Sequence, residues 1–297
     1  MRRDDGAGTR RQARRPVAGP GSGMSKIKLA LIQMRSGTDP ERNIDDASAM
    51  IREAAANGAR LILTPETTNL VQRDPEALQA ALKSPAESTS MVRFADLADE
   101  LSVDLVIGSL ALRGDDGRAV NRQVVFGPDG AVKATYDKIH MFDVQLGAGE
   151  LYRESDQYAP GSKARLVEAA GATLGLTICY DVRFPHLYRR LAKAGATVMT
   201  VPSAFTKVTG RAHWEILLRA RAIETGSFVL APAQGGLHED GRKTWGRSMV
   251  IGPWGEVIAG SHHDEPEILY ATIDPGDAAK ARERIPSLQG DQEITGP

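Results

Sequence analysis

Residues 174–185 read LGLTICYDVRFP, an apolar run that ends at Cys179 and leads into Pro185. The run has the character of a buried strand, and the residues after it have the spacing of a helix. A sharp strand-to-helix turn lifts a side chain out of a sheet and aims backbone N–H groups at a neighbouring oxyanion. The helix N-terminus also favours a thiolate. We therefore predict a nucleophile at Cys179, although a small buried hydrophobe is an equally good interpretation of the local pattern.

Strand and helix patterns alternate on both sides of this segment, which predicts an α/β fold. Residues 127–130, Gly-Pro-Asp-Gly, suit a tight turn between antiparallel strands, so the sheet is expected to be mixed. Expected strands are 27–34, 61–63, 105–107, 120–126, 132–136, 173–178, 197–201, 228–231, 248–251, 256–258 and 268–273. Expected helices are 43–57, one through Met91 to Leu101, 184–191, and one through Ile216, Ala220 and Ile223.

The chain is expected to form one domain over residues 24–297. Residues 1–23 hold six arginines, two aspartates and several prolines and glycines, without the apolar stretch of a signal peptide. We interpret them as a disordered extension, or as residues upstream of a natural start at Met24. Residues 137–160 form a long polar segment without a clear period, and such segments inside a compact domain are usually functional.

Composition limits the partners and the compartment. Without residues 1–23 the totals of 37 basic and 38 acidic side chains become 31 and 36. The resulting net negative charge argues against nucleic acid as a partner. No apolar stretch is long enough to cross a membrane, so a water-soluble protein is expected. A single cysteine forbids an intramolecular disulfide and fits the cytoplasm. Paired histidines such as His262-His263 are able to bind a metal, but no cysteine or carboxylate has the supporting spacing, so no metal is expected.

Two charged residues follow predicted strands and are candidates for the same site. Glu66 follows Leu61-Ile62-Leu63-Thr64-Pro65 and so projects from the carboxyl end of a buried strand, where ligands of α/β sheets gather. Lys138 follows another strand, at the entry to the long polar segment. Each has a plain alternative as a surface charge. The six histidines are the usual bases for a thiol, but none has a distinctive spacing to Cys179.

Three motifs in order give the sequence from about Lys26 to Asp274 a resemblance to the nitrilase superfamily of carbon-nitrogen hydrolases. Residues 64–66 (TPE) resemble the glutamate motif of that family, residues 136–140 (YDKIH) its lysine motif, and residues 179–184 (CYDVRF) its cysteine motif. The resemblance implies a catalytic triad of Glu66, Lys138 and Cys179. It also implies that Glu154 is the second glutamate lining the site.

The resemblance implies a four-layer α-β-β-α sandwich with mixed sheets, no cofactor, and a homodimer or higher homo-oligomer formed through helices. It also implies a mechanism. Glu66 accepts the thiol proton, and the Lys138 ammonium and the Tyr180 backbone N–H hold the oxyanion. A thioester follows, and ammonia is released.

Residues 204–224 resemble the branch that cleaves deaminated glutathione or ω-amides of 2-oxo acids. There Arg183 and Thr209 match positions that bind a substrate carboxylate, and Phe205 matches an aromatic wall. Arg247 departs from this branch, which usually has histidine; it offers a second carboxylate contact or points to solvent. The alternatives are N-carbamoyl amino acid hydrolysis, nitrile hydrolysis, a relative without catalysis, and a redox sensor.

Overall fold

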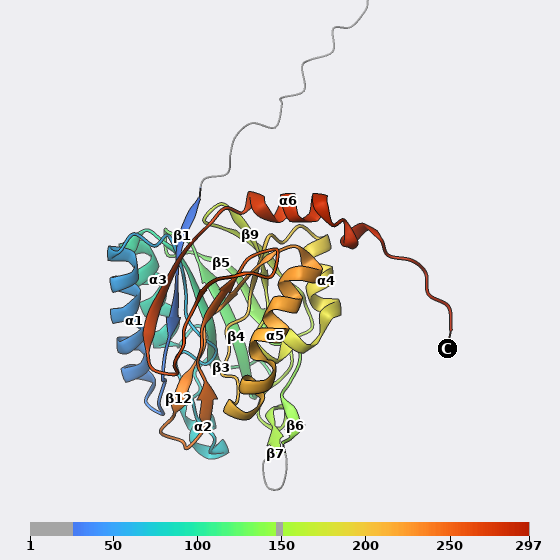
Figure 1. The fold of residues 1–297 in the computed structure, drawn as a ribbon. Coiled ribbons are helices and arrows are strands. Elements are labelled where there is room, and N and C mark those ends of the chain that lie inside the picture. The colour runs from blue at the N-terminus through green and yellow to red at the C-terminus, as the bar shows by residue number, and fades with distance from the viewer. Residues whose placement is uncertain (1–25, 147–150, 297) are drawn as a thin grey trace, which may run out of the picture.

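The computed structural model describes residues 26–146 and 151–296, so the extension predicted for residues 1–23 lies outside the described residues. Two six-stranded sheets dominate the fold (Figure 1). The first has the order β16-β1-β2-β3-β4-β5 and the second β15-β14-β11-β10-β9-β8. Two short hairpins add β6 with β7 and β12 with β13.

The first sheet has parallel strands in its centre and antiparallel strands at both sides. β1 pairs with β2 and β2 with β3 in parallel, whereas β16, β4 and β5 are added antiparallel. Its strands are β1 (Ile27–Gln33), β2 (Leu61–Leu63), β3 (Asp104–Arg113), β4 (Ala119–Phe126), β5 (Val132–Asp137) and β16 (Glu267–Ile273).

The second sheet repeats this plan. β10 lies parallel between β9 and β11, and β8, β14 and β15 are added antiparallel. Its strands are β8 (Leu166–Ala169), β9 (Ala172–Leu176), β10 (Val198–Thr200), β11 (Phe228–Ala231), β14 (Met249–Ile251) and β15 (Val257–Gly260). The hairpin strands are β6 (Asp143–Gln145), β7 (Leu151–Arg153), β12 (Gly235–Leu237) and β13 (Lys243–Trp245).

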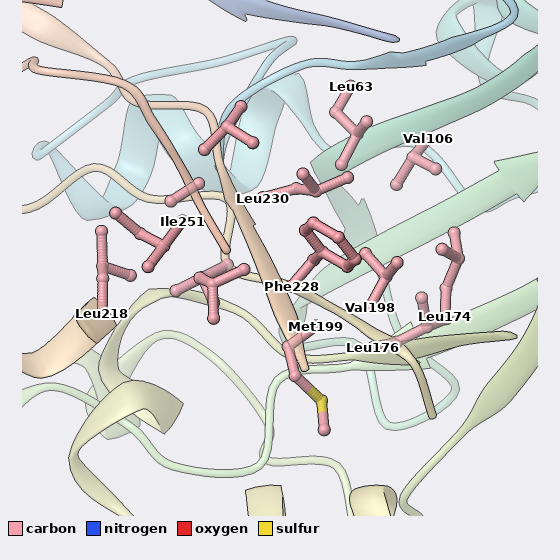
Figure 2. Close-up of a cluster of buried hydrophobic side chains, with 14 of the residues drawn as sticks. Leu63, Val106, Leu174, Leu176, Val198, Met199, Leu218, Phe228, Leu230 and Ile251 are labelled. Carbon is pink, nitrogen blue, oxygen red and sulfur yellow. The ribbon is translucent and has the colours of Figure 1, made fainter. Parts of the chain in front are cut away.

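Helices cover the outer face of each sheet, as Figure 1 shows. Helices α1 (Pro40–Ala56) and α3 (Thr89–Leu101) pack on the first sheet, and α4 (Pro185–Lys193) and α5 (Lys207–Thr225) on the second. Side chains of both sheets meet between them, where Leu63 and Val106 lie near Leu174 and Phe228 (Figure 2). The predicted four-layer sandwich is therefore confirmed. The shorter helices are α2 (Pro75–Ala81) and α6 (Gly276–Arg284).

N-cap side chains explain where the long helices begin. Asp39 accepts hydrogen bonds from the backbone of Glu41 and Arg42 at the start of α1, and Pro40 occupies the first helical position. Ser88 and Thr206 cap α3 and α5 in the same way. The long helices therefore begin at residues whose side chains supply the acceptors that a helix N-terminus lacks.

Two predicted segments gain detail in the structure. The helix predicted through Ile216 and Ile223 is α5, and both of these side chains face outward, with 68% and 55% of their surface exposed. Its buried face carries Trp214, Leu218 and Ala222. The polar segment 137–160 contains the β6–β7 hairpin. Within the described residues, no helix combines the length and apolar character needed to cross a membrane.

Candidate active site

Cys179 lies at the predicted strand-to-helix turn. β9 ends at Leu176, a 3-10 helix over Cys179–Arg183 follows, and α4 begins at Pro185. Cys179 has a φ of 46°, in the left-handed region that a residue with a Cβ rarely occupies. Its N–H donates to the Pro202 carbonyl at 2.9 Å, which fixes the turn against the end of β10. Backbone strain of this kind costs about 1–3 kcal/mol and is typical of functional sites.

The Tyr180 backbone N–H is the donor that the turn leaves available. Among the described residues it donates to no backbone or side-chain acceptor, whereas the neighbouring N–H of Asp181 donates to Ile178. Tyr180 lines the same cavity as Cys179. A free N–H beside a nucleophile is the arrangement that binds an oxyanion.

Lys138 lies between two carboxylates. Its Nζ atom is 2.9 Å from Glu66 Oε1 and 2.8 Å from Glu154 Oε2, and the Lys138 side chain is only 2% exposed. Lys138 follows β5, Glu66 follows β2, and Glu154 begins the 3-10 helix Glu154–Asp156 after β7. The carboxyl ends of two strands and the β6–β7 hairpin therefore bring together three residues that are far apart in the sequence.

Asn121 on β4 joins this group, although no sequence motif indicated it. Its Nδ2 atom donates to Glu66 Oε1 at 2.9 Å and to Glu154 Oε1 at 3.3 Å. Its own backbone carbonyl accepts from the Lys138 N–H at 3.0 Å. Its Oδ1 atom is buried and has no hydrogen-bond partner within the described residues. Asn121 therefore fixes both carboxylates relative to each other.

The second oxygen of Glu66 is held by the backbone. Oε2 accepts the Ala204 N–H at 2.7 Å, and Glu66 and Cys179 line the same cavity. Glu66 is only 4% exposed. Because the carboxylate and the thiol share one cavity, Glu66 stays the predicted base for Cys179.

The charges of the cavity set the protonation states. Burial, followed by the charge of Glu66, raises the pKa of the Cys179 thiol well above its ordinary value. Burial opposes ionisation of Glu66, but the adjacent Lys138 ammonium holds the pKa of Glu66 below its ordinary value. Burial lowers the pKa of Lys138, yet Glu154 and Glu66 together raise it. The resting site is therefore a neutral thiol, a carboxylate and an ammonium, because burial and the charge of Glu66 outweigh the helix N-terminus that favours thiolate.

Asp181 connects the cysteine turn to the lysine segment. It is fully buried and accepts the Ile178 N–H at 2.9 Å, the Tyr136 hydroxyl at 2.7 Å and the His140 N–H at 3.1 Å. The His140 ring Nδ1 lies 2.6 Å from the same carboxylate. Tyr136 and His140 flank Lys138 on both sides in the sequence. Asp181 thus ties the backbone that carries Lys138 to the backbone that carries Cys179.

A cavity of about 240 Å³ is lined by Glu66, Asn121, Lys138, Glu154 and Cys179. Of the predicted substrate contacts, Tyr180, Phe205 and Thr209 line it, and Arg183 does not. Arg183 lies 5.7 Å from the Tyr180 ring and 5.3 Å from the Phe205 ring, and it contacts His213 Nδ1 at 3.3 Å. Its role in binding a carboxylate stays a prediction. The cavity also contains residues that the sequence did not indicate: Tyr158, Arg73, Arg153 and Arg242.

Both the side chain and the backbone of Arg247 contact tryptophan residues. Its guanidinium stacks on the Trp245 ring at 4.7 Å, and its carbonyl accepts the Trp214 Nε1 hydrogen at 2.8 Å. It does not line the cavity. Over residues 26–146 and 151–296, no group of three or more His, Cys, Asp or Glu side chains is arranged to hold a metal ion.

A match to a known protein family shows which family this chain belongs to. The family model of the carbon-nitrogen hydrolases matches residues 28–283. The chain belongs to the carbon-nitrogen hydrolase family. The resemblance of the three motifs is thereby confirmed, and the protein is a hydrolase of carbon-nitrogen bonds other than peptide bonds.

Curated relatives of this carbon-nitrogen hydrolase include both types named by the predicted branch. The deaminated glutathione amidase of Bos taurus is 39% identical over 274 residues, which is 90% of this chain and 83% of the relative. The omega-amidase NIT2 of Homo sapiens is 36% identical, covering 89% and 94% of the two chains.

Solved structures of carbon-nitrogen hydrolases agree with the fold. The C. elegans NitFhit protein superposes with a TM-score of 0.84 and 33% identity, covering 91% of this chain and 66% of that one. An amidase mutant from Nesterenkonia sp. AN1 has a TM-score of 0.76 and 26% identity, with 93% and 97% covered. In that structure the acetamide moiety of fluoroacetamide is covalently attached to the active-site cysteine.

Proposed function

We propose that this carbon-nitrogen hydrolase cleaves the amide of a small 2-oxo acid by transferring the acyl group to Cys179. One observation carries the proposal: Lys138 contacts Glu66 and Glu154 in the cavity that also holds the Cys179 thiol. The similarity to deaminated glutathione amidases and an omega-amidase supports the substrate class.

The first half of the reaction forms a thioester. Cys179 Sγ bonds to the amide carbonyl carbon while its proton passes to Glu66. The oxygen of the tetrahedral intermediate takes the negative charge, which the Lys138 ammonium and the Tyr180 N–H stabilise. The carbon-nitrogen bond then breaks, and the leaving nitrogen takes the proton from Glu66.

The second half regenerates the enzyme. A water molecule attacks the thioester carbonyl and gives a proton to Glu66, and the carbon-sulfur bond breaks. The thiolate recovers that proton, and the carboxylic acid product leaves. Glu154 acts through Lys138, because its two oxygens lie 2.9 and 2.8 Å from Nζ and hold the ammonium toward the oxyanion.

The substrate contacts are proposed from the resemblance and from position. Phe205 and Thr209 line the cavity beside Tyr180, which supports a role in holding the acyl group. Arg183 packs behind Phe205 and Tyr180, and a change of its rotamer would direct the guanidinium toward a carboxylate.

A substrate panel tests this function. The amine released depends on the substrate, because 2-oxoglutaramate loses ammonia whereas deaminated glutathione loses cysteinylglycine. The assay therefore measures the 2-oxo acid, with ammonia as a second readout. We expect turnover of at least one of these amides. Carbon dioxide and ammonia from an N-carbamoyl amino acid, or acid from a nitrile, without turnover of either 2-oxo amide, would contradict the proposal.

The expected pH dependence of kcat/KM follows from the shifted pKa values of Cys179 and Glu66. The thiol stays neutral because its pKa lies well above the ordinary 9.0, and Glu66 stays ionised because its pKa lies below the ordinary 4.5. We expect kcat/KM for 2-oxoglutaramate to be level between about pH 6 and pH 8 and to fall only below the ordinary range of glutamate. A preformed thiolate would instead make the rate rise about tenfold per pH unit, and that profile would exclude Glu66 as the base.

Asn121 is proposed as a positioning residue. Asn121→Ala removes the amide that donates to Glu66 and Glu154, so we expect kcat to fall about 10- to 100-fold with little change in KM. Asn121→Gln, which retains the donor, should recover part of the loss. Steady-state kinetics on both variants measure this. An equal loss in both variants, accompanied by a lower melting temperature, would indicate a merely structural role.

A homodimer and a cytoplasmic location complete the proposal. The outward face of α5 exposes Val208, Ile216 and Ile223, and Trp254 is exposed as well. Apolar side chains gathered on one helix face are typical of an interface. A reduced thiol as nucleophile suits a reducing compartment. Sedimentation velocity measures the oligomeric state.

A further inference from the structure

The 3-10 helix that carries Cys179 ends with a carbonyl for which the helix itself supplies no donor. In a 3-10 helix each carbonyl accepts the N–H of the residue three positions later, and for Val182 that residue is Pro185, which has no N–H. Phe184, with φ −112° and ψ 86°, lies outside the helical region, as expected of a residue before proline. Val182 is fully buried, so its carbonyl needs a donor from elsewhere in the chain.

Arg221 supplies that donor from α5. Its Nε atom donates to the Val182 carbonyl at 2.7 Å, and its Nη1 atom donates to Glu224 Oε1 at 2.8 Å. The Arg221 side chain is only 7% exposed. A planar guanidinium presents its donors in a fixed fork, so the two contacts together fix its orientation. Arg221 does not line the cavity, so it lies behind the catalytic residues.

Arg221 is also connected to the segment before Cys179, through Tyr188 on α4. Its guanidinium carbon lies 5.6 Å from the centre of the Tyr188 ring. The Tyr188 hydroxyl in turn lies 2.6 Å from Thr177 Oγ1, and both side chains are buried. Thr177 precedes Cys179 by two residues, and Val182 follows it by three. Arg221 therefore contacts one side of the nucleophile turn directly and the other side through one ring.

The nucleophile turn depends on such support. Cys179 has a φ of 46°, a strained conformation that persists only where the surrounding structure holds it. The 3-10 helix that follows has poor hydrogen-bond geometry of its own. Without a donor at Val182 the end of this helix is free to tilt, and the Cys179 thiol and the Tyr180 N–H move with it. A displacement of about 1 Å at a reacting centre costs up to about 100-fold in rate.

We propose that Arg221 is a positioning residue for the nucleophile. It holds the 3-10 helix over Cys179–Arg183 in the orientation that presents the Cys179 thiol and the Tyr180 N–H to the cavity. This inference rests on the proposed function, in which the thiol attacks the amide and the N–H stabilises the oxyanion. Arg221 acts through the Val182 carbonyl and touches neither the substrate nor the reacting atoms.

Arg221→Lys tests the proposal. Lysine keeps a positive charge beside Glu224, but one ammonium does not replace the two nitrogens of the fork that reach Val182 and Glu224. We expect kcat for 2-oxoglutaramate to fall about 10- to 100-fold, with KM within about twofold of the wild-type value. Alkylation of Cys179 by iodoacetamide should slow about tenfold, and this second readout needs no turnover.

Two control variants separate positioning from stability. Arg282→Gln removes another arginine that donates to buried carbonyls beside α5, those of Thr225 and Ala196. It should lower the melting temperature by a few degrees, as Arg221→Lys does, because each leaves a buried carbonyl without its donor. It should leave kcat and the alkylation rate within about twofold. Glu224→Gln keeps an acceptor oxygen for Nη1 and removes the charge, so kcat should again stay within about twofold.

The outcomes distinguish this inference from the proposed function. The role of Arg221 is overturned if Arg221→Lys keeps kcat or the alkylation rate within about twofold of the wild-type value. It is also overturned if Arg282→Gln, at an equal fall in melting temperature, loses as much of both. If the wild-type protein cleaves none of the 2-oxo amides, the proposed function fails, and the alkylation rates alone decide whether Arg221 positions the thiol.

Discussion

Cys179→Ala is expected to lower kcat for amide hydrolysis by about 10⁴- to 10⁶-fold, because the covalent route loses its nucleophile. Alanine keeps the Cβ atom, so the strained backbone at φ 46° is unchanged. The melting temperature should therefore stay within a few degrees of the wild-type value. Product formation over hours, together with circular dichroism, measures both effects.

Cys179→Ser serves as the matched variant, since it keeps a hydroxyl in the place of the thiol. A hydroxyl is harder to deprotonate, so this variant should also be nearly inactive while retaining substrate binding. Turnover by Cys179→Ala at more than about one hundredth of the wild-type rate would refute acyl transfer to this residue.

Lys138→Met is expected to lower both kcat and the free energy of unfolding. Removal of the ammonium takes one donor from the oxyanion, which costs about 10²- to 10³-fold in kcat. It also leaves the buried Glu66 and the partly buried Glu154 without their common cation, and breaking a buried pair costs about 3–5 kcal/mol of unfolding free energy. Urea unfolding and steady-state kinetics measure the two losses.

The pH dependence of stability should change sign in this variant. In the wild-type protein the pKa of Glu66 is lowered on folding, so its contribution to stability is present above the unfolded pKa and lost as pH falls through the folded pKa. Without Lys138, burial raises the pKa of Glu66, so the variant should lose stability as pH rises above the unfolded pKa.

The double variant Lys138→Met with Glu154→Gln is the control, because it removes one of the two unpaired charges. It should recover part of the stability and none of the activity. If the single variant Lys138→Met had the stability of the wild-type protein, the contacts of Lys138 with Glu66 at 2.9 Å and with Glu154 at 2.8 Å would not stabilise the fold.

The local part of the site was predictable from the sequence. An apolar strand that ends at a cysteine and runs into a helix already places Cys179 at a turn, because both patterns depend on neighbouring residues. The meeting of Glu66 with Lys138 was not predictable in this way. They are 72 residues apart, and only the packing of the strand ends brings their side chains together. The motif resemblance supplied that link.

Other features lacked any local signal. Asn121 lies in a strand of mostly apolar residues, and only its contacts with two glutamates reveal a role. The buried face of α5 also had no simple signal, because it includes Trp214 and even Arg221, whose Nε donates to the Val182 carbonyl, whereas Ile216 and Ile223 face outward.

The covalent intermediate is the central claim, and mass spectrometry tests it most directly. The wild-type protein is mixed with 2-oxoglutaramate, quenched with acid during turnover, and digested. We predict that the peptide containing Cys179 gains the mass of a 2-oxoglutaryl group, and that this species disappears once the substrate is consumed. Turnover with no acyl group on Cys179 at any quench time, or with the acyl group on another residue, would contradict the account.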